Sequence, residues 1–253
     1  MQIVKNYLYN AMYQVFIIIV PLLTIPYLSR ILGPSGIGIN SYTNSIVQYF
    51  VLFGSIGVGL YGNRQIAFVR DNQVKMSKVF YEIFILRLLT ICLAYLLFVA
   101  FLTINGQYHA YYLFQSIAIV AAAFDISWFF MGIENFKVTV LRNFIVQLLA
   151  LFSIFLFVKS YNDLNIYILI TVLSTLIGNL TFFPSLHRYL VKVNYRELRP
   201  IKHLKQSLVM FIPQIAVQIY WVLNKTMLGS LDSVTSSGFF DQSDKIVKLV
   251  LAI

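Results

Sequence analysis

Apolar runs of about 20 residues recur along the chain, and short polar stretches separate them. A helix of about that length crosses the roughly 30 Å hydrocarbon layer of a membrane, and backbone groups in lipid must be paired within the segment. The pattern therefore predicts membrane-spanning helices rather than strands. We expect seven spans and the start of an eighth, at residues 8–32, 41–61, 80–103, 111–131, 138–158, 166–186 and 208–228, with the last helix beginning near Phe239.

The first two predicted spans meet at Gly33-Pro34-Ser35-Gly36, just after Arg30. Pro lacks a backbone donor and Gly tolerates a positive φ, so the sequence predicts a sharp helical hairpin broken at these residues. Further along, small residues stand at four-residue spacing in 54–62 (GSIGVGLYG), Ser55 with Gly59 most clearly. That spacing indicates close helix packing rather than a phosphate-binding loop.

Composition supports the membrane class. Hydrophobic residues make up 59% of the chain and charged residues only 11%, with a mean hydropathy of +0.79, whereas soluble domains carry about 25% charged residues. The apolar run after Lys5 has no small-residue cleavage site, so we expect a retained helix rather than a signal peptide. The predicted fold class is an all-α polytopic membrane protein.

The basic residues in loops predict the orientation, because cytoplasmic loops carry an excess of Lys and Arg. With the N-terminus inside, the outer side receives only Arg30, Lys159 and Lys225. Thirteen basic residues fall on the inner side: Lys5, Arg64, Arg70, Lys75, Lys78, Lys137, Arg142, Arg188, Lys192, Arg196, Arg199, Lys202 and Lys205. We therefore expect a cytoplasmic N-terminus in the inner (cytoplasmic) membrane, and this bias accounts for the net charge of +10 without a nucleic-acid partner.

The longest polar connection, residues 187–205, follows six predicted spans. It predicts a division into an N-terminal bundle of six helices (1–190), a basic cytoplasmic linker (191–205) and the start of a second bundle (206–253). The alternative for the linker is a short amphipathic helix on the inner leaflet.

A weak internal repeat supports two bundles. Residues separated by a constant 200 positions are the same or similar: Gly38 and Gly238, Asn44 and Asp244, Ile46 and Ile246, Val47 and Val247. Transporters built from duplicated bundles show such repeats and handle substrate between the halves. Chance similarity between apolar segments is the alternative.

Charged residues within the spans are candidates for function, because a charge in hydrocarbon costs at least about 2.5 kcal/mol. Arg87 and Asp125 lie at the same depth on neighbouring predicted helices, roughly 10 Å from the inner end. They predict an interhelical ion pair. Two alternatives stay open: a protonatable Asp125 that couples transport to a proton or sodium ion, and an Arg87 that snorkels to the inner surface.

Arg30 and Lys225 occupy equivalent places in the two proposed repeats. If the repeats face each other, both cations converge on one cavity suited to an anion such as phosphate. If they do not, both anchor at the outer interface. The aromatic run Trp128-Phe129-Phe130 is typical of an interfacial belt.

The remaining reactive side chains form no pattern that indicates an enzyme or a cofactor. His109, His187 and His203 are scattered, and no His, Cys or acidic residues show the spacing of a metal site or of a nucleophile and its base. We therefore expect no catalytic residues, no bound metal and no cofactor other than a coupling ion.

Four ordered blocks of the sequence carry a resemblance to a known family. They are residues 26–38 (PYLSRILGPSGIG), 61–67 (YGNRQIA), 125–137 (DISWFFMGIENFK) with Arg142-Asn143, and 238–246 (GFFDQSDKI). Together they resemble the Wzx-type polysaccharide repeat-unit flippases. The resemblance runs over essentially the whole chain and implies a fold like that of the MATE-like exporter superfamily, with two helical bundles facing a central cavity. Family members are usually nearly twice this long, so the chain resembles the first bundle and about two helices of the second.

The resemblance also implies a function: translocation of undecaprenyl-pyrophosphate-linked oligosaccharide for surface polysaccharide, such as O-antigen or capsule, with polysaccharide assembly proteins as partners. Within it, Arg64 and Arg87 join Arg30 and Lys225 as candidate ligands of the pyrophosphate. Tyr42 and Tyr49 are candidates to stack on sugars. The alternatives are a multidrug or ion-coupled exporter, a lipid II flippase and, in another class, a membrane polymerase. The sequence does not indicate which sugar is carried.

Overall fold

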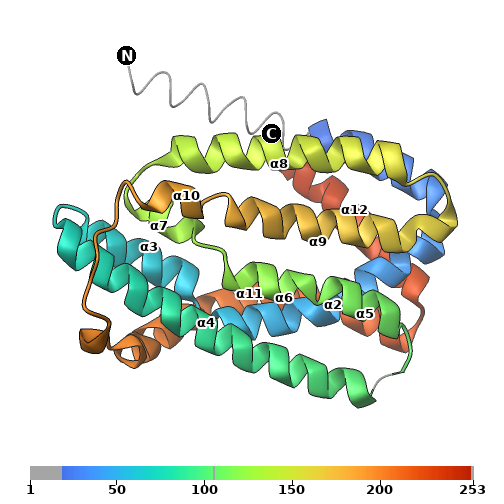
Figure 1. Cartoon of the computed structure of the whole chain (residues 1–253). Helices are drawn as coiled ribbons and strands as arrows, with labels where there is room; N and C mark the ends of the chain where they lie inside the picture. Colours follow the sequence, from blue (N-terminus) through green and yellow to red (C-terminus); the bar gives the residue numbers. More distant parts are fainter. Residues whose placement is uncertain (1–18, 105, 252–253) are drawn as a thin grey trace.

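The computed structural model describes residues 19–104 and 106–251, and all the elements in these ranges are helices. Figure 1 shows their arrangement. After a helix at Ile19–Ile31 they are α2 (Gly33–Ser55), α3 (Val58–Val69), α4 (Gln73–Ile104), α5 (His109–Gln115), α6 (Ile117–Ala123), α7 (Ser127–Gly132), α8 (Phe136–Phe157), η1 (Tyr161–Asp163), α9 (Leu164–Leu180), α10 (Phe183–Leu186), η2 (Tyr195–Glu197), η3 (Pro200–His203), α11 (Leu204–Leu231) and α12 (Val234–Leu251).

The all-α membrane class is confirmed. Within the described ranges, six stretches are long and apolar enough to cross a membrane, and they match the second to seventh predicted spans. Ile19–Ile31 matches the end of the first, whose residues 8–18 lie outside the described part. The eighth helix begins at Val234 rather than near Phe239 and carries four charged residues: Asp241, Asp244, Lys245 and Lys248.

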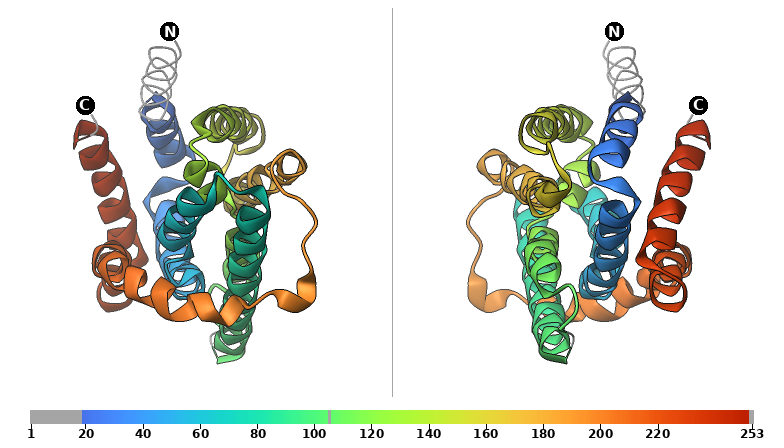
Figure 2. Two further views of the ribbon diagram at one scale, coloured as in Figure 1. Left: turned by 90° about the vertical axis from the view of Figure 1, so that its left-hand side faces the viewer. Right: turned by 90° about the vertical axis from the view of Figure 1, so that its right-hand side faces the viewer.

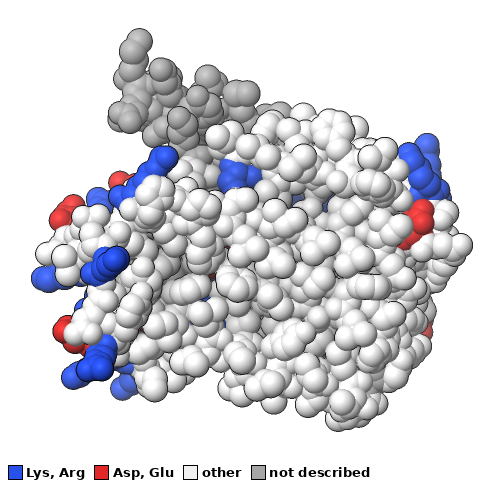
Figure 3. Space-filling view, viewed as in Figure 1, with Lys and Arg blue, Asp and Glu red and all other residues white. Residues whose placement is uncertain are grey.

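The long helices lie side by side with their axes roughly aligned (Figure 1). The α3–α4 and α7–α8 connections and the segment between α10 and α11 lie at one end of the bundle, and the α4–α5, α8–α9 and α11–α12 connections lie at the opposite end. Figure 3 shows Lys and Arg gathered mainly at the first of these ends. This is the charge asymmetry that the loop sequences predict.

The first hairpin turns one residue earlier than expected. The helix that starts at Ile19 ends at Ile31, and Gly33 supplies the left-handed backbone of the turn with φ +64°. Pro34 does not break the chain; it stands in the first turn of α2, where its missing N–H is not needed.

A second break divides the next span into α2 and α3, at Ile56 and Gly57, which both have positive φ. The Ser207 hydroxyl of α11 donates to the freed Ile56 carbonyl at 2.6 Å. A Cβ at Gly57 would lie 2.8 Å from the Ser207 carbonyl oxygen, whereas a Cβ at Gly59 would meet nothing within 4 Å. The close packing predicted for this motif is therefore present, but through Gly57 rather than Gly59.

The aromatic run in α7 is part of the core, and its assignment to an interfacial belt is wrong. Trp128, Phe129 and Phe130 are all at most 1% exposed. Trp128 stacks on Phe80 and Phe130 stacks on Phe182, with ring centroids 5.6 and 5.0 Å apart. The run is buried because α3, α4 and α10 surround it.

Helices α11 and α12 pack against α2, and Figure 2 shows the start of α11 crossing the bundle before the helix turns along it. One close approach between α2 and α12 joins the two glycines of the proposed repeat: a Cβ on Gly238 would lie 2.8 Å from the Gly38 Cα. Hydrogen bonds flank this crossing, at 3.1 Å between the Ser41 and Ser237 hydroxyls and 2.9 Å between those of Ser45 and Thr226. Repeat-related residues thus meet each other; the division into 1–190, 191–205 and 206–253 stays a prediction.

The polar segment before α11 forms two short 3-10 turns, η2 and η3, rather than the amphipathic helix considered as an alternative. It is held by Glu82 of α4, whose side chain is fully buried. The Arg199 backbone N–H, the Lys202 ammonium and the His203 ring lie 2.9, 2.6 and 3.0 Å from its carboxylate. The Tyr61 hydroxyl contacts His203 from the other side at 2.7 Å.

Replacing Glu82 with Gln is expected to release this segment. A buried charge pair that loses one partner is costly, so we expect trypsin to cleave after Lys202 about tenfold faster, equivalent to about 1.4 kcal/mol. Glu197→Gln is the matched control, because Glu197 is exposed and its ion pair with Lys78 is long, at 3.5 Å. An exposed pair of this kind contributes little to stability. Equal cleavage of both variants would contradict the role of Glu82.

Candidate functional site

A cavity of about 750 Å³ opens between the α11–α12 pair and the helices α2 and α4 to α9. Its wall includes 13 uncharged polar residues: Asn40, Ser41, Asn44, Gln48, Ser55, Gln115, Ser127, Thr139, Asn143, Tyr167, Thr171, Thr175 and Asn179. Six charged residues complete it: Arg87, Asp125, Arg142, Lys225, Asp241 and Lys245. Four cations against two carboxylates give the cavity wall a formal charge of +2 (4 − 2). The helices that carry this wall are otherwise mostly apolar within their spans.

Arg87 reaches the cavity where the fourth span is interrupted between α6 and α7. The residue is 4% exposed, so it does not snorkel to the surface. Its Nε donates to the Ala122 carbonyl at 2.6 Å, and its Nη2 lies 3.4 Å from an oxygen of Asp125. The predicted ion pair is therefore present, and Arg87 also donates to a backbone carbonyl at the end of α6, where the helix breaks.

The break in the fourth span is completed by two further side chains. The Asp125 carboxylate accepts from the Ser127 backbone N–H at 3.0 Å, at the start of α7. Asn179 of α9 donates to the Ala121 carbonyl at 2.7 Å. Non-helical backbone at membrane depth is found where it lines a cavity, as it does here. Coupling of Asp125 to a proton or sodium ion stays a prediction.

Arg142 is a cavity residue that the sequence analysis counted among the basic residues of the inner side. It stands in the second turn of α8, and its guanidinium donates to the Gly178 carbonyl at 2.5 Å and to the Asn143 and Asn179 side-chain oxygens at 2.6 and 2.7 Å. It also lies 4.3 Å from the Phe182 ring centroid. These three uncharged acceptors fix the orientation of the guanidinium.

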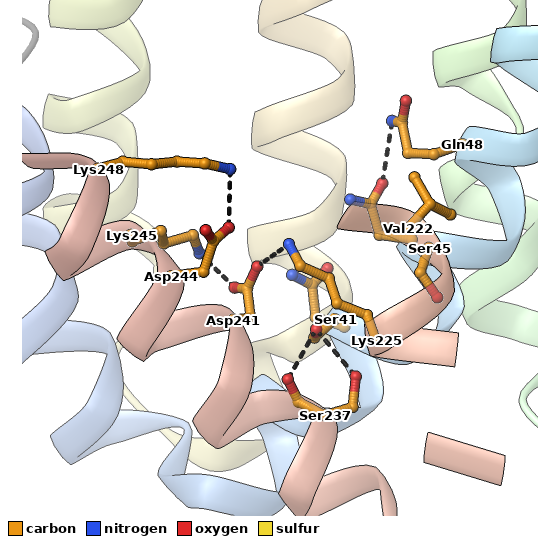
Figure 4. A network of polar contacts seen from close by, with 12 residues as sticks. Ser41, Ser45, Gln48, Val222, Lys225, Ser237, Asp241, Asp244, Lys245 and Lys248 are labelled. Carbon is orange, nitrogen blue, oxygen red and sulfur yellow. Dashed lines mark hydrogen bonds and ion pairs between the residues drawn. The ribbon is translucent and has the colours of Figure 1, made fainter. Parts of the chain in front are cut away.

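Lys225 of α11 and Lys245 of α12 both contact Asp241 of α12, and Figure 4 shows the two ammonium groups converging on its carboxylate. Lys225 was predicted as a cavity cation and does line the cavity. Lys245 and Asp241 were not selected from the sequence, although the 200-residue offset had marked Asp244, one residue before Lys245.

The structure does not bring the other predicted residues into this cavity. Arg30 is exposed, and Arg64 lies in a separate pocket with its guanidinium 5.5 Å from the Phe68 ring. Tyr42 packs under Gly229 of α11, and Tyr49 is absent from the cavity wall. The expected convergence of Arg30 with Lys225 is thus not formed, because Arg30 is exposed and lies outside the cavity wall that Lys225 lines.

The chemistry of the wall suits an anion that also carries hydroxyl groups. Fixed cations replace the water lost by a phosphate, and amide and hydroxyl side chains hydrogen-bond sugars. Gln115 donates to the Asn40 side-chain oxygen at 3.1 Å, while its own buried oxygen has no hydrogen-bond partner in the part of the chain that the structure describes. Among the described residues, no group of three or more His, Cys, Asp or Glu side chains has the geometry of a metal site.

Two curated proteins are similar to this chain over most of its length. The "Putative O-antigen transporter" of Escherichia coli (strain K12) is 25% identical over 247 residues, which is 96% of this chain and 60% of that protein. The protein of the same name from Shigella dysenteriae is 26% identical over 232 residues, or 89% of this chain and 58% of that protein. No solved structure matches the chain.

The chain therefore spans about 60% of the length of these relatives. Residues 3–253 match the family described as "Polysaccharide biosynthesis protein". Together with the apolar helices, these similarities identify a multi-pass membrane protein of a transporter family. The chain belongs to the polysaccharide biosynthesis protein family.

Proposed function

We propose that the chain belongs to a transporter that moves an undecaprenyl-pyrophosphate-linked oligosaccharide from the inner to the outer leaflet of the cytoplasmic membrane. The observation that carries this proposal is the cavity, in which four cations and many neutral polar groups lie inside a bundle of apolar helices. A pyrophosphate-linked oligosaccharide needs cations for its phosphates and neutral polar groups for its sugar hydroxyls. The activity of the complete transporter is part of the proposal, because the relatives are longer than this chain.

The cations are suited to the pyrophosphate for physical reasons. Arg142 presents a planar fork that is already oriented by neutral acceptors, so little entropy is lost when it binds phosphate oxygens. Arg87 is held by the Ala122 carbonyl and by the Asp125 carboxylate. Lys225 and Lys245 add mobile point charges on the opposite wall. A cavity for a cationic drug would need more carboxylates than cations, whereas this one has four cations and two carboxylates.

The orientation in this proposal follows the charge asymmetry of the molecule. The end with more Lys and Arg is assigned to the cytoplasm (Figure 3). The linker turns η2 and η3 then lie at the inner leaflet, where anionic lipid attracts basic side chains.

The test is deletion of the gene in its own host, followed by analysis of surface polysaccharide and of lipid-linked precursors. We expect surface polysaccharide to disappear and complete lipid-linked units to accumulate on the cytoplasmic leaflet, where an enzyme added from outside cannot digest them. Accumulation of single units on the outer leaflet would instead indicate a polymerase. Unchanged surface polysaccharide would contradict both functions.

A further inference from the structure

We propose that Asp241 is an internal counter-anion that holds Lys225 and Lys245 in the empty cavity and gives them up to the substrate anion. This inference rests on the proposed function, because the pyrophosphate is the anion that takes the carboxylate's place. It assigns to Asp241 a positioning role: the side chain competes with the ligand and does not bind it.

The geometry places one carboxylate between two cations that arrive from different helices. Lys225 of α11 contacts Oδ1 of Asp241, and Lys245 of α12 lies 2.6 Å from Oδ2 (Figure 4). The Asp241 side chain is 8% exposed, whereas those of Lys225 and Lys245 are 20% and 39% exposed. All three residues line the same cavity. An anion in the cavity therefore reaches the two ammonium groups more easily than it reaches the carboxylate.

Chemistry favours an exchange at this point rather than at the arginines. A lysine ammonium is a point charge on a flexible stem, so it can turn from one acceptor to another without losing a fixed fork of bonds. Arg87 is instead tied to the Ala122 carbonyl, and Arg142 to the Gly178 carbonyl. The arginines thus provide permanent contacts, and the lysines provide contacts that depend on occupancy.

The position of Asp241 links this exchange to helix packing. Lys225 joins α11 to Asp241 of α12, whereas Lys245 pairs with Asp241 within α12. Ser237, one turn earlier in α12, hydrogen-bonds Ser41 of α2. Ser45 of α2 bonds Thr226, the neighbour of Lys225, at 2.9 Å. Release of the lysines therefore removes a direct α11–α12 contact while the bonds of both helices to α2 persist.

A neighbouring pair supplies a matched control. Asp244 is also buried in α12 and is also paired with a lysine four residues later, since Lys248 lies 2.8 Å from its carboxylate. Lys248 in turn lies 4.0 Å from the Trp221 ring centroid. Asp244 is not part of the cavity wall. Its removal changes the net charge of the protein by the same amount as removal of Asp241, but at a place that the anion does not occupy.

The experiment measures calorimetric binding of inorganic pyrophosphate to the purified full chain in detergent, at neutral pH and one fixed low salt concentration. Asp241→Asn is expected to bind pyrophosphate about tenfold more tightly than the wild type, because an adjacent negative charge has been removed in a medium of low dielectric. Asp241→Glu, which keeps the carboxylate, is expected to bind as the wild type does. Asp244→Asn is expected to tighten binding much less than Asp241→Asn, because Asp244 acts on Lys245 from outside the cavity wall and contacts neither lysine of the pair.

A second pair of variants guards against misfolding of Asp241→Asn. In a Lys245→Met background the carboxylate faces one lysine, and Asp241→Asn then leaves the net charge of the cluster as in the wild type. We again expect about tenfold tighter binding when Asp241→Asn is added to this background.

Pyrophosphate binding by Asp241→Asn that is equal to or weaker than that of the wild type would overturn the inference. Equal tightening by Asp244→Asn would also overturn it. In both cases, binding by the wild type leaves the proposed function standing. Absence of binding in every variant would overturn both. Binding by Asp241→Asn alone supports the inference.

Discussion

Arg142→Gln is expected to abolish export of polysaccharide to the cell surface. The guanidinium lines the cavity and is oriented by Gly178, Asn143 and Asn179. The proposed function therefore predicts that it binds the pyrophosphate with two parallel hydrogen bonds. Loss of a buried charge-assisted contact costs about 2–5 kcal/mol, which corresponds to at least about a 30-fold loss of transport. The measurement is surface polysaccharide in a deletion strain that expresses each variant at equal protein level.

The matched controls are arginines that lie elsewhere. Arg64→Gln removes the same group from a pocket separate from the cavity, and Arg30→Gln removes it from an exposed position. Both variants are expected to export nearly as well as the wild type. Arg142→Lys is expected to be intermediate, because an ammonium keeps the charge and loses the fork. Normal export by Arg142→Gln together with loss in Arg64→Gln would reverse the site assignment.

Gly38→Ala is expected to be the most destabilising conservative substitution in α2. A Cβ at this position would lie 2.2 Å from the Val234 carbonyl oxygen and 2.9 Å from the Thr235 nitrogen, which are backbone atoms that cannot rotate away. The two helices must separate, and such overpacking costs typically about 1–3 kcal/mol. We expect a lower thermal unfolding temperature in detergent and weaker cross-linking between cysteines placed at positions 41 and 237.

The control for this substitution is Gly59→Ala. Gly59 also lies within a helix, α3, and a Cβ there would meet nothing within 4 Å. Because Ala favours the helix over Gly by about 1 kcal/mol, this variant is expected to be as stable as the wild type or more stable. If Gly38→Ala unfolded at the same temperature as Gly59→Ala, the crossing of α2 and α12 would not be a tight contact.

Depth along the helices could be predicted from the sequence. The apolar runs set where each span lies, and the fixed rise per residue placed Arg87 and Asp125 at one level, where the structure pairs them. The constant offset between Gly38 and Gly238 likewise marked two residues that meet at the helix crossing. These successes share one cause: each depends only on position along a helix.

The direction in which a side chain points could not be predicted in the same way. A soluble helix shows its buried face as an apolar stripe, but a membrane span is apolar on all sides and carries no such mark. Arg30 could therefore not be told from a cavity residue, and Arg142 could not be told from a loop residue. The breaks at Ile56–Gly57 and before α7 were missed because they depend on Ser207, Arg87 and Asn179, which come from other helices.

The amino-acid sequence by itself therefore determined the class of the protein, the number and depth of its spans, their charge asymmetry and the family resemblance, since all of these are properties of residues taken in order. Only the tertiary structure decided which cations share the cavity: Arg87, Arg142, Lys225 and Lys245. It also decided that two of them are held by Asp241. The physical reason is that rotation of a helix about its axis is set by packing against its neighbours, and no single span encodes it.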